Sequence, residues 1–529
     1  MQYCDVEYLL VFLPIIMFLY QIMPKKTRFV VLLLASYYFF FSISGKLLMY
    51  LLFTTLFIYF IGLWLKSVKR RSLNELSTSS KEEKKRIKEK YKKKQRIVLF
   101  LGIILQVVLL SLLKYLPFIT LNINNILELF GSTLRMNEVK FLAPIGISFY
   151  TLEAISYLVD VYRDKIEADN NIFRLSLYMA FFSQIMEGPI ARYNDTSESL
   201  YKGEKIHYKN MCFGFQRICY GMIKKLVVAD RLNNIVEVIL LNYHEYSGGL
   251  LLFAVILYTI QLYMDFSGVM DIVIGSGEIF NVKLPENFRQ PFFSKSISDF
   301  WTIWHITLGT WFKDYIFYPV SLSKFSRKIT GSLRKKIGNH FGPLVAGSIA
   351  LLCVWLLNGL WHGAGYNYIF FGLYHFTFIL LANIFEPLII KGYKVLHINR
   401  DNFIVKGIRI VKTTIIVFFG ELFFRVPILE DGLNIFKKIF TDFSLKEFKN
   451  DTYLSFGLDI QDFKIILVTI IIVFIVGILK ERNVNIRENV SKKNIVVRWI
   501  LYYILVLYLL TFGAYGDGYT PIDPMYADF

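Results

Sequence analysis

Two histidine-containing stretches organise this sequence: DFWTIWHITLGTWFKDYIFYP at residues 299–319 and WLLNGLWHGAGYNYIFFG at residues 355–372. The first contains His305 and the second contains His362, and both histidines stand beside tryptophans in apolar surroundings. An ionisable side chain is costly to place inside a bilayer, so one found there is a candidate for function. His305 and His362 are therefore the first candidates for functional residues.

The composition indicates an all-α, polytopic integral membrane protein. Hydrophobic residues make up 55% of the 529 residues, above the level of about 45–50% in soluble domains. Runs such as 97–113, 248–263, 465–479 and 500–512 carry no charges, and with their flanks they approach the roughly 20 residues that cross a bilayer. We predict roughly ten to twelve transmembrane helices, with re-entrant or interfacial segments between them. The alternating strands of a membrane β-barrel are not evident.

About half of the formal net charge of +19 is concentrated in residues 66–96, where 14 Lys and Arg stand against 4 Asp and Glu. A basic segment between two membrane helices is expected on the cytoplasmic side. We therefore predict a cytoplasmic basic loop here, partly helical over 77–94, and no nucleic-acid partner. Lys25, Lys26 and Arg28 agree with this topology if the N-terminus lies outside.

No tandem repeat or linker divides the sequence, so we predict one transmembrane domain over residues 1–529. Its parts are N-terminal helices with the basic loop at 1–116, a core at 140–386, and C-terminal helices with a tail at 387–529. The amphipathic stretch 210–241 is typical of a segment that lies in the membrane interface. The polar, proline-containing stretch 281–298 either lies outside the bilayer or lines a water-filled funnel.

The cysteines indicate neither a metal site nor a disulfide framework. There are four, and none of their spacings is CxxC or another metal-binding pattern. We predict no bound metal and no bound cofactor. The first apolar run lacks a basic leader and a cleavage site, so we expect it to remain as a helix.

The residues around His362 suit proton transfer. Asn358 precedes it by four residues, so on a helix the two would share a face, and the amide would donate to the imidazole or to an oxyanion. Gly363 and Gly365 would let a ligand approach the backbone. Burial keeps a histidine neutral, which is the state that accepts a proton.

Trp301 and Trp304 flank His305, and aromatic walls of this kind exclude water. The alternative is that both histidines are hydrogen-bonded core residues among interfacial tryptophans. Asp265 would either orient a neighbouring group or cap the start of a helix. His375 is more consistent with a structural role.

The same stretches resemble those of a known family. DFSG at 265–268, LPENF at 284–288, and the two histidine stretches occur in the order found in the membrane-bound O-acyltransferases, and PIGISFYTLEAISYLVDVYR at 144–163 is similar to the bacterial alginate O-acetylase branch. The resemblance covers nearly the whole chain. It implies a helical fold around a central tunnel that joins the two faces of the membrane.

The resemblance also implies the site and the reaction. His362 matches the family's catalytic histidine and His305 its second histidine, with Trp304 and Trp361 beside them. The expected activity moves an acetyl group from a cytoplasmic thioester, acetyl-CoA or another, toward hydroxyls of an extracellular polysaccharide. The expected setting is the bacterial plasma membrane, with an extracellular SGNH-type acetyltransferase as partner. The ending DPMYADF resembles a tail in which a tyrosine, here Tyr526, carries the acyl group.

Two other functions remain open at this point. Within the same class, the chain would transfer D-alanine to teichoic acid. In a different class, it would export a polysaccharide or lipid without acyl chemistry, although transporters of this size often show two related halves, which are not found here.

Overall fold

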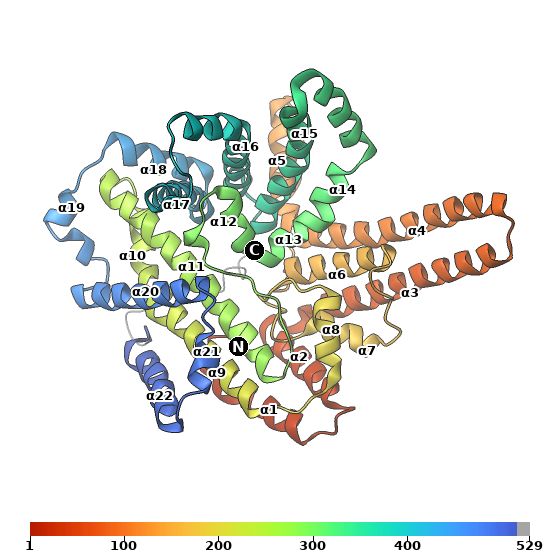
Figure 1. Ribbon diagram of the computed structural model, residues 1–529, viewed down its shortest axis with the longest axis horizontal. Coiled ribbons are helices and arrows are strands. Elements are labelled where there is room, and N and C mark those ends of the chain that lie inside the picture. Colours follow the sequence, from red (N-terminus) through yellow and green to blue (C-terminus); the bar gives the residue numbers. More distant parts are fainter. Residues whose placement is uncertain (516–529) are drawn as a thin grey trace. The chain divides into compact units, whose positions relative to one another are not determined.

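The computed structural model describes residues 1–515, and every regular element in them is helical, as predicted (Figure 1). The described chain forms two compact units. Unit 1 comprises Met1–Gly214 and Val273–Pro285, and unit 2 comprises Phe215–Ile272 together with the described residues from Glu286 onward. Helices α9 (Tyr208–Met222) and α11 (Gly248–Ile279) each contribute residues to both units.

Unit 1 holds the N-terminal helices. Its elements are η1 Glu7–Phe12, α1 Leu13–Ile22, α2 Arg28–Ser44, η2 Gly45–Leu47, α3 Leu48–Thr78, α4 Lys81–Leu110, η3 Ser111–Tyr115, α5 Leu116–Leu129, α6 Ile147–Tyr162, α7 Ile172–Ala180 and α8 Tyr193–Lys202. Helix α6 is buried along almost its entire length. A helix that is buried on all sides belongs to the centre of its unit, so α6 is the core of unit 1.

Unit 2 holds both histidine stretches. Its elements are η4 Ile223–Ala229, α10 Asp230–Leu241, η5 Pro291–Phe293, α12 Ile297–Ile303, α13 Ile306–Phe312, η6 Lys313–Phe317, α14 Tyr318–Ser321, α15 Lys324–His362, α16 Tyr366–Val395, α17 Phe403–Arg425, α18 Leu429–Thr441, α19 Lys446–Lys449, η7 Thr452–Leu454, α20 Ile460–Glu481, α21 Ile486–Ser491 and α22 Ile495–Phe512.

Seven helical segments in residues 1–515 are long and apolar enough to cross a membrane, which confirms a multi-pass membrane protein. These segments are Arg28–Thr78, Lys81–Leu129, Gly248–Ile279, Lys324–His362, Tyr366–Val395, Ile460–Glu481 and Ile495–Phe512. The first contains both α2 and α3, so the number of segments is not the number of crossings. The predicted ten to twelve crossings therefore stay a prediction.

Residues 66–96, predicted as a cytoplasmic basic loop that is partly helical over 77–94, are helical almost throughout; their cytoplasmic location stays a prediction. Helices α3 and α4 continue through this region as a long hairpin, interrupted only near Ser80, which begins α4 with a capping box (Figure 1). Val68, Ile87 and Tyr91 form a small apolar cluster between the two helices. The Tyr91 hydroxyl donates to the Glu75 carboxylate at 2.6 Å. The contacts that hold the hairpin therefore join the two helices rather than successive turns of one.

Glycines allow α15 and α16 to pack closely in unit 2. A Cβ on Gly359 would collide with the Tyr368 carbonyl, and one on Gly372 would collide with the Trp355 carbonyl. The backbones therefore meet without intervening side chains. This contact fixes the end of α15, where His362 stands.

Candidate active site

His305 lies at a sharp change of chain direction between two short helices. Helix α12 ends at Ile303, Trp304 is extended, and His305 has the left-handed backbone angles φ 47° and ψ 54° before α13 begins. A non-glycine residue in this conformation is strained, and it persists only when its surroundings hold it. The question is therefore which contacts hold His305.

Asn287, from the LPENF motif, supplies these contacts. Its Oδ1 accepts from the Thr307 backbone N–H at 3.1 Å and from the Thr307 hydroxyl at 3.0 Å, and it lies 3.1 Å from His305 Nδ1. Its backbone carbonyl accepts from the Ile306 N–H at 2.9 Å. The Asn287 side chain is fully buried. These contacts, the Asn287 clasp, therefore hold residues 305–307 at the start of α13.

This clasp assigns the tautomer of His305. Because an amide oxygen only accepts, Nδ1 carries the proton and Nε2 keeps its lone pair. Nε2 is buried and has no hydrogen-bond partner within residues 1–515. Burial also lowers the pKa of His305 to about 3, so the ring is neutral at ordinary pH. His305 thus presents a buried, neutral nitrogen whose lone pair is available as a hydrogen-bond acceptor.

Aromatic side chains pack around the bend at His305, and the predicted role of Trp304 in excluding water stays a prediction. The Trp304 ring stacks on Phe300 at 5.3 Å and meets the edge of Phe288 at 5.1 Å. Phe266 contacts the His305 ring directly, with centroids 4.9 Å apart. Side chains of this kind are expected to keep water from the imidazole.

Trp361 connects the two predicted histidines. Its ring centroid lies 5.6 Å from that of His305 and 5.0 Å from that of His362. His362 is 6% exposed and is the last residue of α15, and its ring meets Phe424 at 5.0 Å. Two histidines that are 57 positions apart in the sequence therefore contact the same indole ring.

Asn358 stands on α15, one turn before His362, as the sequence predicted. Its side chain is buried, and its Oδ1 has no hydrogen-bond partner among the described residues. A buried amide oxygen without a partner is costly, so it marks a place where a ligand or water would be stabilised. The predicted contact with His362 or an oxyanion stays a prediction.

The glycines after His362 have a different role from the one predicted. A Cβ on Gly363 would overlap the Tyr368 ring, and a Cβ on Gly365 would overlap the Asn367 side chain. The space beside both backbones is therefore filled by the protein itself. Asn367 in turn donates to the Val426 carbonyl at 2.9 Å. These glycines let α16 begin directly after the histidine rather than admit a ligand.

Asp265 does not cap a helix, because it lies in the interior of α11. Its carboxylate is 2.8 Å from the Lys225 ammonium, which also lies 2.7 Å from Asp230. All three side chains are nearly fully buried. Asp265 is thus a member of a buried ion-pair triad, which holds η4 and α10 to α11.

A second group of buried charges lies on the same helices. Asp271 contacts the Lys224 ammonium at 2.6 Å and the Arg217 guanidinium at 2.8 Å, and Arg217 also pairs with Glu286. The stretch 210–241 was predicted to lie in the membrane interface. In unit 2 its basic residues Arg217, Lys224 and Lys225 pair with acidic residues. The predicted interfacial location of the stretch stays a prediction.

His375 is the residue whose position the sequence did not indicate. It is fully buried, and neither ring nitrogen has a hydrogen-bond partner within residues 1–515. Its ring contacts Trp301 at 4.7 Å and Phe371 at 4.8 Å, and Phe371 also contacts His362 at 5.8 Å. Only its spacing within an apolar helix was visible in the sequence. The structure adds it to the aromatic network of the two predicted histidines.

The remaining predicted site residue, Tyr526, lies outside the described residues. Within residues 1–515, no group of His, Cys, Asp and Glu is placed to hold a metal ion.

A comparison with protein families matches residues 8–333 to the membrane-bound O-acyltransferase family. The matched range covers more than half of the chain. It includes His305, Asn287 and Asp265, and it ends before His362.

Curated relatives carry related names. The chain is 30% identical to a probable alginate O-acetylase of Pseudomonas aeruginosa over 65% of this chain and 60% of the relative. It is 31% identical to a peptidoglycan O-acetyltransferase of Helicobacter pylori over 53% of this chain and 54% of the relative. It is also 31% identical to a teichoic acid D-alanyltransferase of Bacillus subtilis over 50% of this chain and 64% of the relative. The chain thus spans less than two thirds of the length of these relatives.

Proposed function

Because this chain belongs to the membrane-bound O-acyltransferase family, we propose that it transfers an acetyl group from a thioester donor to hydroxyls of an extracellular polysaccharide. Relatives named as O-acetylases of alginate and of peptidoglycan support acetyl as the group transferred. Family membership also favours acyl transfer over the export of a polysaccharide or lipid.

The reaction needs a base and a dry site. A hydroxyl oxygen attacks the thioester carbonyl carbon, the new C–O bond forms, and the C–S bond breaks. The hydroxyl proton passes to an imidazole nitrogen and then to the leaving thiolate, so that no charge accumulates. A neutral histidine is suited to both steps. Exclusion of water protects the thioester from hydrolysis.

We assign the proton transfer to His362 and its support to His305. His362 matches the catalytic histidine of the family in the sequence GLWHGAG, and both histidine rings contact the Trp361 ring. Asn358 would donate to the oxyanion of the tetrahedral intermediate through its amide N–H. Trp304 and Trp361 form walls of the site, and Asp265 supports it only through the scaffold.

One observation carries this proposal most directly. The chain uses a strained backbone and a buried asparagine to hold His305 with its basic nitrogen uncommitted. A histidine with a purely structural role would be expected to satisfy both ring nitrogens. This arrangement supports acid–base chemistry beside Trp361.

The donor and the acceptor lie on opposite faces of the membrane in this proposal. Acetyl-CoA or another thioester donates from the cytoplasmic side of a bacterial plasma membrane, and a tunnel leads to the outer side. An extracellular SGNH-type acetyltransferase then completes transfer to the polysaccharide, with Tyr526 as a carrier of the acetyl group.

Chemical analysis of the cell surface tests the proposal. Cells that lack this protein are expected to lose base-labile acetate from a surface polysaccharide, and the wild-type chain is expected to restore it. The His362→Ala chain, present at an equal level in the membrane, is expected not to restore it. Unchanged acetate in cells without the protein would contradict acetyl transfer.

Transfer of D-alanine to teichoic acid is the second candidate. The Bacillus subtilis relative, named a teichoic acid D-alanyltransferase, favours it. The two functions differ in the ester that is lost: ester-linked D-alanine, rather than acetate, would disappear from the envelope together with the protein.

A further inference from the structure

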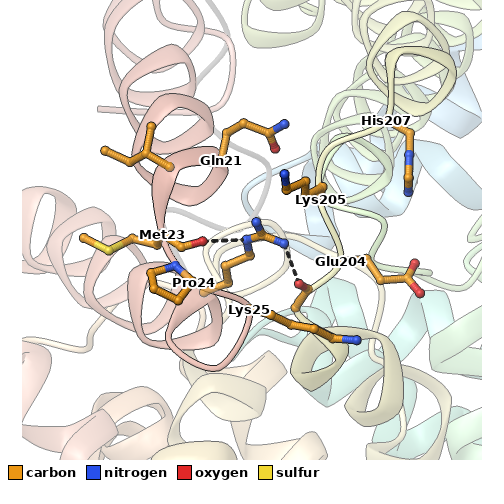
Figure 2. Close-up of a pocket in the computed structure, with 10 residues that line it drawn as sticks. Gln21, Met23, Pro24, Lys25, Glu204, Lys205 and His207 are labelled. Carbon is orange, nitrogen blue, oxygen red and sulfur yellow. Dashed lines mark hydrogen bonds between the residues drawn. The ribbon is translucent and has the colours of Figure 1, made fainter.

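A polar pocket in unit 1 lies where α1 ends and α2 begins (Figure 2). Its volume is about 650 Å³. One wall comes from residues 21–25 and Arg28, and the other from residues 203–205 and His207, which follow α8. None of these residues belongs to the candidate active site, and the proposed acyl transfer does not use them.

Arg28 forms the floor of this pocket. It is 4% exposed, and its Nε donates to the Tyr20 and Met23 carbonyls at the end of α1, at 3.1 Å each. Its Nη1 donates to the Gly203 carbonyl at 2.8 Å. Its Nη2 has no hydrogen-bond partner among the described residues. A guanidinium has five N–H donors, so this buried cation keeps donors available to the pocket.

The opposite wall is held in place by specific contacts. The Gln21 amide oxygen accepts from the Ile206 backbone N–H at 3.0 Å. Gly203 has φ +60°, and a Cβ there would collide with the Lys25 carbonyl. Only glycine fits this position without strain. The pocket is therefore a built feature and not a chance gap between side chains.

The pocket has an excess of positive charge. Lys25, Arg28 and Lys205 line it, and none of them pairs with a carboxylate within the described part of the chain. Glu204 is the acidic residue in the lining, and it is engaged by the Lys202 ammonium at 2.9 Å and by Asn281. The hydrogen bond from Lys202 lowers the pKa of Glu204, so this pair stays ionised and internally neutral. Three cations that form no salt bridge with a carboxylate of the described residues therefore line the cavity.

The position of the pocket bears on which anionic ligand it would bind. Phe18 and Ile22 lie one helical turn apart on α1 and are 64% and 58% exposed, as expected of side chains that face lipid. Ile22 also lines the pocket. The cations follow α1 on the side that the basic charge pattern assigns to the cytoplasm. From this charge pattern and this exposure we infer that the pocket lies near the lipid headgroups, beside side chains that face the acyl chains.

We propose that this pocket binds the phosphate of an anionic phospholipid from the cytoplasmic leaflet. Arg28 Nη2, Lys25 and Lys205 bind the phosphate oxygens, and the acyl chains lie along Ile22 and Phe18. Basic pockets at the cytoplasmic ends of membrane helices recognise lipid headgroups in this way. Charge-assisted hydrogen bonds to phosphate favour arginine in the buried position.

Lipid binding to the purified full-length protein in detergent tests the proposal. The probes are phosphatidylglycerol, zwitterionic phosphatidylcholine and inorganic phosphate, with bound lipid counted by native mass spectrometry. The variant is Lys25→Gln/Lys205→Gln, which leaves Arg28 and its backbone contacts intact. The matched control is Lys84→Gln/Lys88→Gln, which removes the same charge from exposed positions on the α3–α4 hairpin.

We expect phosphatidylglycerol to bind more tightly than phosphatidylcholine. Each lysine near an anionic headgroup contributes a factor of about fivefold, so the pocket variant should bind phosphatidylglycerol about 25-fold more weakly. The control should bind like the wild type. Equal binding of both lipids, or equal binding by the pocket variant, would overturn the proposal. Displacement of the lipid by an equal concentration of inorganic phosphate would mean that the pocket binds free phosphate rather than a phospholipid.

Discussion

Unit 2 contains two buried polar regions that are built in opposite ways. On η4, α10 and α11, Lys225 lies between Asp230 and Asp265, and each charge has a partner within 2.8 Å. Around α12 and α16, His305 and His375 keep ring nitrogens with no partner among the described residues. Paired charges stabilise a scaffold, whereas open nitrogens are retained at the cost of stability. The difference separates the residues that hold the protein together from those available for chemistry.

His362→Ala tests the open region with the largest expected effect. Removal of a general base costs about 10²–10⁴-fold in rate, so ester formation should fall by at least about 100-fold. Ester content per membrane-inserted protein is the measurement. His244→Ala is the control, since it removes an exposed histidine outside the site. Activity within about threefold of wild type in His362→Ala would assign the proton transfer to another residue.

Lys225→Met tests the paired region. Removing the cation leaves the two buried carboxylates of Asp230 and Asp265 uncompensated, which is expected to cost about 3–5 kcal/mol in the free energy of unfolding. Thermal unfolding in detergent and the amount of protein in the membrane are the readouts. Lys225→Met/Asp230→Asn/Asp265→Asn should regain part of the loss. If Lys225→Met were as stable as the wild type, the ion-pair triad would not stabilise the fold.

Asn287 combines features of the paired and the open region. Its hydrogen bonds stabilise the local backbone, and they also position the His305 ring. Asn287→Leu removes the acceptor of Thr307 and His305, and we expect ester formation to fall by about tenfold or more at equal protein level, since a buried hydrogen bond is worth about 1–3 kcal/mol. Asn287→Asp keeps the acceptor and should retain more activity than Asn287→Leu. If Asn287→Asp were less active than Asn287→Leu, the hydrogen bonds that Asn287 accepts would not be needed for the function of His305.

The smallest effect concerns pH. Burial lowers the pKa of His305 to about 3 from the ordinary 6.5, so between these values the unfolded chain binds a proton that the folded chain does not. Stability therefore rises with pH across this window and is lost as pH falls from about 6.5 toward 3. His305→Gln should show a weaker loss than wild type in melts between pH 7 and 5. Parallel loss in both proteins would mean that His305 is not held neutral.

Much of the fold follows from hydropathy alone. The charge-free runs 97–113 and 248–263 lie in or at the ends of the long helices α4 and α11, because a backbone in lipid must satisfy its hydrogen bonds within one helix. The basic segment 66–96 was predicted to be helical only over 77–94, and its two helices extend further than that. Its run of lysines obscured the few apolar residues, such as Val68 and Ile87, that pair the two helices.

The site was predictable in its residues but not in its geometry. Tryptophans beside His305 and His362 are visible in the sequence, and the structure places both beside Trp361. The clasp by Asn287 joins residues through an irregular segment, which no periodicity reveals. Of the two roles predicted for Asp265, the helix cap is wrong, and its partner Lys225 could not be identified because it is 40 positions away. Buried pairing depends on how helices meet, and local patterns do not encode that.

The central claim is that open nitrogens carry the chemistry while paired charges carry the scaffold. The most direct measurement is ester content per folded protein, determined side by side for His305→Ala and Lys225→Met, with thermal unfolding of the same samples. We predict that His305→Ala forms at least about tenfold less ester per folded protein than the wild type, with little loss of stability. Lys225→Met should be less stable, but its ester content per folded protein should stay within about threefold of the wild type. The reverse pattern would contradict the claim.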